Sequence, residues 1–362
     1  MSLGDVKAQL DHCIETGKRG SGSGKRASPG LRMHGGAPEG TAPRSPLPTG
    51  HGGVGVVLGR TGSTFRVWIG EREVEAVLRG RVKHRDDERV VAGDVVELEL
   101  HGGGAVTITG VRPRRSVLVR REAGGGGTRR PQPLAANVDQ VVVVAATRDP
   151  VPNARMLDRF FVIAEANGLP AGLVVNKMEL DRAVGPRLRA RYAPAGYRVI
   201  ETSVVAGDGL ADFAELLAGC TSVLCGPSGA GKSSLLNALQ PGLRLRTGAV
   251  SAKWRTGRHT TVASRLLPLT GAAGGYVVDT PGIREVGTWG IDPNDLGACF
   301  PEFRPYLDRC QFDDCRHLAE PGCAVRSAAA AGAFDPDRLV SYERLYCELS
   351  EPSWSSARRR AR

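Results

Sequence analysis

Short runs of alternating hydrophobic and polar residues cover the chain between residues 51 and 115. Five runs rich in Val, Ile and Leu lie at 54–60, 64–69, 74–82, 94–100 and 105–111, and turn residues such as Gly, Ser and His separate them. This pattern is typical of short antiparallel β-strands with one buried face. Five such strands in about 60 residues predict a small barrel. An OB-fold is the most economical choice, and an SH3-like barrel is the alternative.

From residue 136 onward the period lengthens, and apolar strands alternate with amphipathic helices. Strands are predicted at 138–147, 171–178 and 197–204, at the start of 221–240 and in 274–282, and helices at 154–168 and 209–219. The strands are nearly continuous apolar runs, as in strands that are buried on both faces. This alternation predicts an α/β fold, a doubly wound and mostly parallel sheet with helices on both faces, which we assign to residues 136–295.

The remaining segments lack such periodicity. Residues 1–50 are rich in Gly, Ser, Pro and Arg and are predicted to be a disordered basic extension. A Gly/Arg linker at 116–135 separates the barrel from the α/β domain. A Cys-rich segment followed by helix is predicted to form a mostly helical domain at 296–350, and a basic tail occupies 351–362.

The net charge of +11 favours a polyanionic partner, because much of the excess lies in these irregular segments. Residues 1–50 carry seven Lys and Arg against four acidic residues. The tail ends with Arg358, Arg359, Arg360 and Arg362. Flexible basic segments suit binding to RNA phosphates, and tails that only improve solubility are the alternative.

Nothing in the sequence indicates a membrane segment or a secretory signal. No apolar run approaches the ~20 residues that span a bilayer. The N-terminus lacks the compact apolar core of a secretory signal. Its Arg, Ser and Gly content leaves an organellar transit peptide as an alternative, against which its acidic residues argue. We therefore expect a cytoplasmic protein without membrane contact, and a monomer.

A phosphate-binding loop is indicated at residues 226–233, Gly-Pro-Ser-Gly-Ala-Gly-Lys-Ser, between a predicted strand and a predicted helix. The glycines allow backbone N–H groups to turn toward phosphate oxygens, and the helix N-terminus adds its positive dipole. Lys232 is expected to reach the β- and γ-phosphates, and Ser233 to ligate Mg²⁺. The predicted nucleotide-binding residues here are Gly226, Pro227, Ser228, Gly229, Ala230, Gly231, Lys232, Ser233 and Ser234.

Two segments downstream of the P-loop resemble the switch regions of nucleotide hydrolases. The sequence DTPG follows an apolar strand, where Asp279 would hold Mg²⁺ through water and the Gly282 amide would sense the γ-phosphate. The polar stretch 247–265 has the position of a switch I loop. Either Thr260 or Thr261 would contact Mg²⁺ there, and an ordinary strand-edge threonine pair is the alternative.

The strand at 171–178 runs into a sequence that resembles the NKxD element, which recognises guanine. Its residues are Asn176, Lys177, Met178 and Glu179. In that element a carboxylate accepts hydrogen bonds from the ring N1–H and the exocyclic amino group, a pairing that adenine does not offer. Glu179 is one methylene longer than Asp, and Asp181 is the less favoured substitute. The companion loop beside the base is expected to contain Thr202 and Ser203.

The order of these elements along the chain is base motif, companion loop, P-loop, switch I and DTPG, whereas an ordinary GTPase begins with the P-loop. Permutation moves only the chain breaks among surface loops, so the same sheet can form either way. The five elements together predict a circularly permuted GTPase domain that binds GTP or GDP with Mg²⁺.

Three of the eight cysteines lie with a histidine in a segment of fourteen residues. These residues are Cys310, Cys315, His317 and Cys323. Three thiolates and one imidazole suit a closed tetrahedral Zn²⁺ site with no open catalytic position. The other cysteines are scattered, which argues against a disulfide framework. One structural Zn²⁺ is therefore predicted, and independent structural cysteines are the alternative.

These motifs together resemble the bacterial ribosome small-subunit-dependent GTPase A family. The matching sequences are LAANVDQVVVV, NKMEL, GPSGAGKSSLLNAL, GRHTTVASRL, DTPGIRE and CQFDDCRHLAEPGCAV, and the resemblance covers residues 50–350. It implies an OB-fold, a circularly permuted GTPase domain and a zinc domain. It also implies late maturation of the 30S subunit, contact with 16S rRNA, release of an assembly factor, and GTPase activity that the 30S particle stimulates. Glu179 departs from the common Asp of the family, and the N-terminal extension is atypical.

The sequence also bears on how hydrolysis would be controlled. The position after Gly282, where many GTPases have a Gln that orients water, is Ile283. We therefore expect slow intrinsic hydrolysis that docking on the 30S subunit accelerates. His259 is the candidate for positioning water, and contact with phosphate or rRNA is its alternative role. Because residues 283–301 join DTPG to the zinc domain, γ-phosphate binding is expected to reposition that domain.

Two other classes of function remain open from the sequence. One is a P-loop ATPase or small-molecule kinase, against which Asn176 and Lys177 argue. The other is an RNA-binding assembly chaperone with a non-catalytic nucleotide site, against which the intact Lys232, Ser233 and Asp279 argue.

Overall fold

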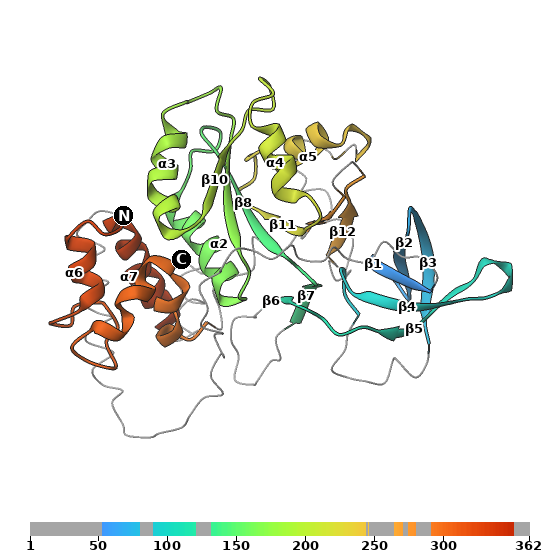
Figure 1. The fold of residues 1–362 in the computed structure, drawn as a ribbon, viewed down its shortest axis with the longest axis horizontal. Coiled ribbons are helices and arrows are strands. Elements are labelled where there is room, and N and C mark those ends of the chain that lie inside the picture. Colours follow the sequence, from blue (N-terminus) through green and yellow to red (C-terminus); the bar gives the residue numbers. More distant parts are fainter. Residues whose placement is uncertain are drawn as a thin grey trace, which may run out of the picture.

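The computed structural model describes residues 53–79, 90–120, 132–243, 245, 264–270, 274–279 and 291–350. A β-barrel lies at one end of the molecule, a helical region at the other, and an α/β domain between them (Figure 1). The predicted basic extension, most of the switch I loop and the basic tail lie outside the described residues. Within those residues, no helix has both the length and the apolar composition that crossing a bilayer requires.

The N-terminal barrel is closed and has the strand order β1-β2-β3-β5-β4. Its strands are β1 (Val54–Thr61), β2 (Thr64–Ile69), β3 (Arg72–Leu78), β4 (Val95–Leu100) and β5 (Val106–Val111). Inward-facing apolar side chains fill it, among them Val57, Phe65, Val67, Val96 and Ile108. A small closed barrel of five strands is the architecture of an OB-fold. The predicted OB-fold is therefore confirmed.

One pairing in the barrel differs from the prediction of antiparallel strands. β3 and β5 pair in parallel, while the other neighbouring pairs are antiparallel. Five strands in a closed ring cannot alternate in direction throughout, because the number is odd, so at least one pair must be parallel. A single short helix, η2 (Gly102–Gly104), connects β4 to β5.

A two-stranded antiparallel sheet connects the barrel to the α/β domain. It consists of β6 (Val117–Arg120) and β7 (Gln132–Ala136). These strands lie at the two ends of the segment for which the sequence predicted a linker without strands. Leu118 and Ala135 are buried in the same core as Val56 of the barrel and Val141 of the α/β domain. The barrel and the α/β domain therefore share one continuous hydrophobic core.

The central sheet has six strands in the order β10-β9-β8-β11-β13-β12. These are β8 (Gln140–Ala146), β9 (Ala171–Asn176), β10 (Arg198–Glu201), β11 (Thr221–Cys225), β12 (Arg265–Pro268) and β13 (Tyr276–Asp279). All pairs are parallel except β12 with β13. Helices cover both faces of the parallel strands, which explains their nearly continuous apolar sequences.

Among the described residues, two α-helices pack on each face of this sheet. They are α2 (Ala154–Ala166), α3 (Val184–Tyr192), α4 (Leu210–Leu217) and α5 (Lys232–Leu239), with the short helices η3 (Ala193–Ala195) and η4 (Pro241–Leu243). α2 and α3 bury Phe161 and Leu188 in one core, whereas α4 and α5 bury Phe213 and Leu235 in another. The predicted doubly wound α/β fold is confirmed. Helix α3 was not predicted.

The C-terminal region consists of helices around an aromatic core. They are η7 (Pro293–Asp295), η8 (Gly297–Cys299), η9 (Pro301–Arg309), α6 (Ala324–Ala330) and α7 (Pro336–Ser350). The core contains Phe300, Phe303, Phe334, Tyr342 and Tyr346. The sequence predicted helix after the Cys-rich segment, and the structure has two helices there. Gly332, with a φ of +75°, follows the end of α6, and Pro336 begins α7.

Candidate functional site

The loops that carry the predicted nucleotide motifs meet at one edge of the central sheet. β9 leads into the base motif and β11 into the P-loop, and only β8 lies between these two strands. Because the three strands are parallel, their carboxyl ends lie at the same edge. Ligands of open α/β sheets bind at this edge.

Two P-loop glycines lie where no side chain fits. Gly226 has a φ of +138°, and a Cβ there would lie 2.1 Å from the Val144 carbonyl oxygen. Gly231 has a φ of +91°, and a Cβ there would lie 2.2 Å from Asn176 Nδ2. Both distances are far below van der Waals contact. The loop backbone therefore packs directly on β8 and on the base motif, which requires glycine.

Lys232 opens helix α5 and turns its ammonium group back over the P-loop. Its Nζ donates hydrogen bonds to the carbonyl oxygens of Gly226 and Pro227, each at 2.8 Å. Ser233 and Ser234 lie half-buried in the first turn of the helix. A lysine charge, a helix N-terminus and a glycine-rich loop together form an arrangement suited to phosphate.

The amide side chain of Asn176 joins the base motif, the companion loop and the P-loop. It is buried at the end of β9, and its Nδ2 donates a hydrogen bond of 3.1 Å to the Ala230 carbonyl oxygen. Its Oδ1 accepts a hydrogen bond of 3.2 Å from the Thr202 hydroxyl. Segments that the sequence analysis identified separately therefore contact one another at this side chain.

The turn after Asn176 is held by the loop between β8 and α2, which the sequence analysis did not single out. Lys177 has a left-handed backbone with a φ of +61°, and its Nζ donates to the Asp149 carbonyl oxygen at 2.6 Å. The Thr147 hydroxyl donates to the Lys177 carbonyl oxygen at 2.5 Å. Met178 N–H donates to the Thr202 carbonyl oxygen at 3.1 Å. No recognised motif marks this loop in the sequence.

The two carboxylates considered for guanine recognition have different surroundings. Glu179 is exposed and has neither a hydrogen bond nor an ion pair within the described part of the chain. Asp181 accepts a hydrogen bond of 3.2 Å from Ala183 N–H, and its Oδ2 lies 3.4 Å from Arg148 Nη2. Glu179 is therefore the carboxylate that is available to a ligand. In the companion loop, Ser203 Oγ accepts from Ala206 N–H at 3.0 Å and shapes the turn.

The predicted Mg²⁺ and γ-phosphate contacts lie largely outside the described residues. Val278 of β13 pairs with Val223 of β11. The end of β13, which includes the Asp279 backbone, therefore lies beside β11 and the P-loop. The Asp279 side chain and the residues His259, Thr260, Thr261 and Gly282 are not among those described. Their roles stay predictions.

The predicted zinc ligands form one cluster in the C-terminal region. His317 Nδ1 lies 3.5 Å from Cys310 Sγ and 3.4 Å from Cys323 Sγ, and these two sulfurs are 4.0 Å apart. With Cys315, all four ligand atoms lie within 4.8 Å of one another. Tetrahedral Zn²⁺ with its usual bond lengths separates sulfur and nitrogen ligands by about 3.5–3.8 Å. The geometry and the donor set therefore fit Zn²⁺.

The protonation of this cluster is set by burial. Burial raises the pKa of the Cys315 thiol to about 12 and lowers the pKa of His317, which favours a neutral thiol and a neutral imidazole. A divalent cation reverses the preference of the thiols, because it binds thiolate. The loop between the ligands is organised by Glu320, whose carboxylate accepts from Leu318 N–H at 2.8 Å and from Ala319 N–H at 3.1 Å.

Helix α2 connects the nucleotide edge to the C-terminal region. It begins directly after the β8–α2 loop, with Asn153 as its N-cap. Along the helix, Phe161 is buried in the core of the sheet, whereas Val162 is buried in the core of the C-terminal region. The two regions therefore share this helix.

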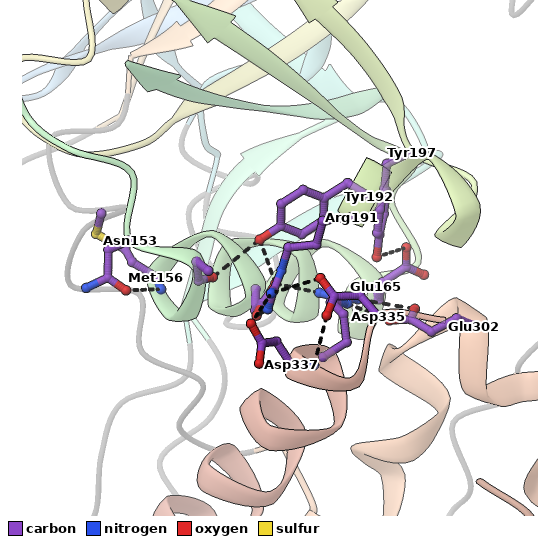
Figure 2. Close-up of polar contacts among 12 residues, drawn as sticks. Asn153, Met156, Glu165, Arg191, Tyr192, Tyr197, Glu302, Asp335 and Asp337 are labelled. Atoms are coloured by element: carbon purple, nitrogen blue, oxygen red, sulfur yellow. Dashed lines mark hydrogen bonds and ion pairs between the residues drawn. The ribbon is translucent and has the colours of Figure 1, made fainter. Parts of the chain in front are cut away.

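A buried charge network reinforces this junction. Arg338 of α7 and Asp158 of α2 are both fully buried, with 2.7 Å between Nη1 and Oδ1, and Arg338 also binds Glu302 through two hydrogen bonds. Arg191 of α3 pairs with Asp158 at 3.0 Å. It also pairs with Asp335 at 3.1 Å (Figure 2). Burial alone lowers the pKa of Arg338, but the charges of Asp158 and Glu302 raise it by more, so the guanidinium stays charged.

Comparisons with known proteins agree on one family. A family model described as RsgA GTPase matches residues 111–289. The small ribosomal subunit biogenesis GTPase RsgA of Gemmatimonas aurantiaca is 49% identical over 302 residues, 82% of this chain and 97% of that protein. The protein of the same name from Moorella thermoacetica is 38% identical over 82% of this chain and 97% of its own length.

Two solved structures resemble the fold closely. The crystal structure of YjeQ from Thermotoga maritima has a TM-score of 0.69 and 32% identity, and the match covers 83% of this chain and 99% of that chain. YloQ, described as a circularly permuted GTPase, has a TM-score of 0.65 and 28% identity over 84% of this chain and 98% of its own. The predicted circular permutation is therefore confirmed.

Proposed function

The chain belongs to the RsgA GTPase family and is a GTP hydrolase, and we propose that it acts in the biogenesis of the small (30S) ribosomal subunit. The observation that carries the nucleotide site is the hydrogen bond of 3.1 Å between Asn176 Nδ2 and the Ala230 carbonyl oxygen. It supports one site in which the base motif and the P-loop hold opposite ends of a single guanine nucleotide. The names of the relatives support the ribosomal role.

In this site the P-loop residues 226–234 bind the phosphates, and Lys232 exchanges the carbonyl oxygens of Gly226 and Pro227 for β- and γ-phosphate oxygens. Glu179 accepts hydrogen bonds from the guanine edge. Contacts to the base and its surroundings come from Asn176, Lys177, Met178, Glu179, Thr202 and Ser203. The exposure of Glu179 and the engagement of Asp181 by Arg148 support this choice of carboxylate.

For the hydrolytic step, Ser233 and Asp279 would hold Mg²⁺, which neutralises phosphate charge when bound. Thr260 or Thr261 closes over the nucleotide, and Gly282 N–H responds to the γ-phosphate. His259 orients the attacking water. Because Ile283 takes the place of a water-orienting Gln, turnover is slow until the subunit docks.

The remaining regions serve docking on the subunit. Cys310, Cys315, His317 and Cys323 would hold one structural Zn²⁺, whose bonds stabilise the small domain at 296–350. The GTPase domain at 136–295 is flanked by the extension at 1–50, the OB-fold domain at 51–115, the linker at 116–135 and the tail at 351–362. The basic residues of these flanking segments contact 16S rRNA. The protein acts in the cytoplasm as a monomer and promotes release of an assembly factor.

The test is GTP hydrolysis by the full chain, measured as phosphate release with and without purified 30S subunits. We expect slow release alone and a clear acceleration with the subunits. Lys232→Ala is the matched variant without a working P-loop, and it should show neither. ATP and GDP are also compared as competitors of GTP hydrolysis. ATP should inhibit only at a far higher concentration than GDP.

Two results would support the rival functions instead. Equal inhibition by ATP and GDP would indicate an ATPase or kinase. Equal support of 30S maturation in cells by the Lys232→Ala variant and the wild type would indicate an RNA-binding chaperone whose nucleotide site is not catalytic.

A further inference from the structure

The loop 147–150 contacts both halves of the nucleotide site, although none of the recognised motifs includes it. On one side it touches the base motif through Thr147 and Asp149. On the other side it faces the P-loop, since a Cβ on Gly229 would lie 3.3 Å from the Asp149 carbonyl oxygen. Loop 147–150 is therefore placed to set the position of one half relative to the other.

Thr147 makes the closest of these contacts. Its side chain is buried, with 1% of its surface exposed. Its hydroxyl donates to the Lys177 carbonyl oxygen at 2.5 Å, and its N–H donates to the Asn176 carbonyl oxygen at 3.0 Å. One residue thus holds two successive carbonyl groups of the base motif.

The backbone that Thr147 holds has an uncommon conformation, and the Lys177 carbonyl oxygen also accepts a hydrogen bond of 3.0 Å from Leu180 N–H within the same turn. Lys177 has a φ of +61°, a left-handed conformation that residues with a Cβ rarely adopt. Its own side chain adds a second tether through the hydrogen bond of 2.6 Å from Nζ to the Asp149 carbonyl oxygen. Glu179 follows two residues later, so the Lys177 backbone is one of the factors that set where its carboxylate points.

We propose that Thr147 is a positioning residue for guanine selectivity. Its hydroxyl keeps the Lys177 peptide in the conformation that directs the Glu179 carboxylate to the N1–H and amino group of the base. This inference rests on the proposed function, because it requires Glu179 to contact guanine. It adds a residue that touches no nucleotide atom and acts through the base motif.

The test compares Thr147→Val, which keeps the shape and removes the hydroxyl, with Thr147→Ser, which keeps the hydroxyl. Affinities for GDP, for ADP and for IDP, which lacks the exocyclic amino group, are measured by calorimetry. In Thr147→Val we expect GDP to bind about tenfold more weakly, the loss of one hydrogen-bonded restraint, while IDP weakens much less. KM for GTP should rise and kcat stay within about twofold. Thr147→Ser should keep the preference of the wild type for GDP over IDP.

Thr221→Val is the matched control. Thr221 is also a buried threonine, but it is the first residue of β11 and so lies at the opposite end of this strand from the P-loop. Its hydroxyl has no hydrogen-bond partner among the described residues. This variant should bind GDP and IDP as the wild type does. If Thr147→Val does not fold, Thr147→Ala takes its place, because it removes the same hydroxyl and leaves a smaller side chain.

The outcomes separate the inference from its premise. If the wild type prefers GDP over IDP and over ADP, and Thr147→Val keeps both preferences, the positioning role is wrong while the guanine site stands. If Thr147→Val weakens GDP and IDP equally, Thr147 has a structural role only. If the wild type does not prefer GDP over ADP, the proposed guanine site and this inference fall together.

Discussion

At the scale of single residues, Asn176 has both polar atoms of its amide engaged, one as donor to Ala230 and one as acceptor from Thr202. The amide therefore has one orientation, because rotating it by 180° would set like groups against each other. The same side chain limits the P-loop, since a Cβ on Gly231 would collide with its Nδ2. Base motif and P-loop are thus built as one unit.

The choice between Glu179 and Asp181 as the guanine-binding carboxylate gives a residue-scale prediction. Glu179→Ala should weaken GDP binding by about 5- to 150-fold, the range for losing a bidentate base contact, and should leave ADP binding unchanged. Asp181→Ala removes only the exposed pair with Arg148 and a turn contact, so GDP affinity should change by less than threefold. Calorimetric titration of both variants with GDP and ADP measures this. The reverse ranking would assign the base contact to Asp181.

At this scale, the residues that could be predicted from the sequence are those that form a spaced pattern. The four metal-ligand candidates and the P-loop glycines were identified because their chemistry requires fixed spacing, and the cluster and the tight backbone contacts agree with that. Thr147 was missed because a single threonine at the end of a buried strand has no pattern around it. Its partner Lys177 lies 30 residues away, and only the fold brings them together.

At the scale of secondary-structure elements, α2 is the part that belongs to two regions at once. Asp158 and Arg338 are buried charges from segments 180 residues apart. A buried ion pair adds little net stability when formed, but it is costly to break because a charge is left without its partner. The network therefore specifies how α7 docks on α2 more than it stabilises either helix.

The element-scale prediction concerns this docking. Arg338→Met leaves Asp158 and Glu302 buried with fewer partners, and it should lower the free energy of unfolding by about 3–5 kcal/mol. Arg198→Met is the control, because its pair with Glu215 is exposed and should contribute less than about 1 kcal/mol. Urea unfolding of the wild type and both variants measures the difference. Equal stability of the two variants would mean that the network does not hold the junction.

Elements were predictable in proportion to their burial. β8 and β9 were predicted within about two residues, because parallel strands covered on both faces are continuous apolar runs. Helix α3 was missed, since VGPRLRARY has few apolar residues and contains Gly and Pro. β12 was missed because it is a four-residue strand at the sheet edge. The parallel pairing of β3 with β5 depends on barrel closure, which no local pattern encodes.

At the scale of the whole molecule, the barrel and the C-terminal region attach to different sides of the nucleotide-binding domain. The barrel shares a core with the sheet, and Gly59 of β1 lies against the backbone at Ser264, next to β12. The C-terminal region docks through α2. Both attachments lie close in sequence to nucleotide-site segments, because Ser264 belongs to the predicted switch I stretch and α2 follows loop 147–150.

The basic tail provides the whole-molecule prediction, because its charge either binds RNA phosphates or only improves solubility. Each arginine that neutralises a phosphate releases counterions, so the slope of log K against log salt is negative. Its magnitude should fall by about 0.7–0.9 for each such contact that is lost. Changing Arg358, Arg359, Arg360 and Arg362 together to Gln should therefore reduce the magnitude of the salt slope of 30S binding by up to about 3.6, whereas the same four changes to Lys should preserve it. Affinity for GDP should stay unchanged in both variants, because none of the residues that we propose to bind the nucleotide belongs to the tail. Binding to 30S subunits at several KCl concentrations measures the slopes, and identical slopes for the Gln and Lys variants would assign the tail to solubility.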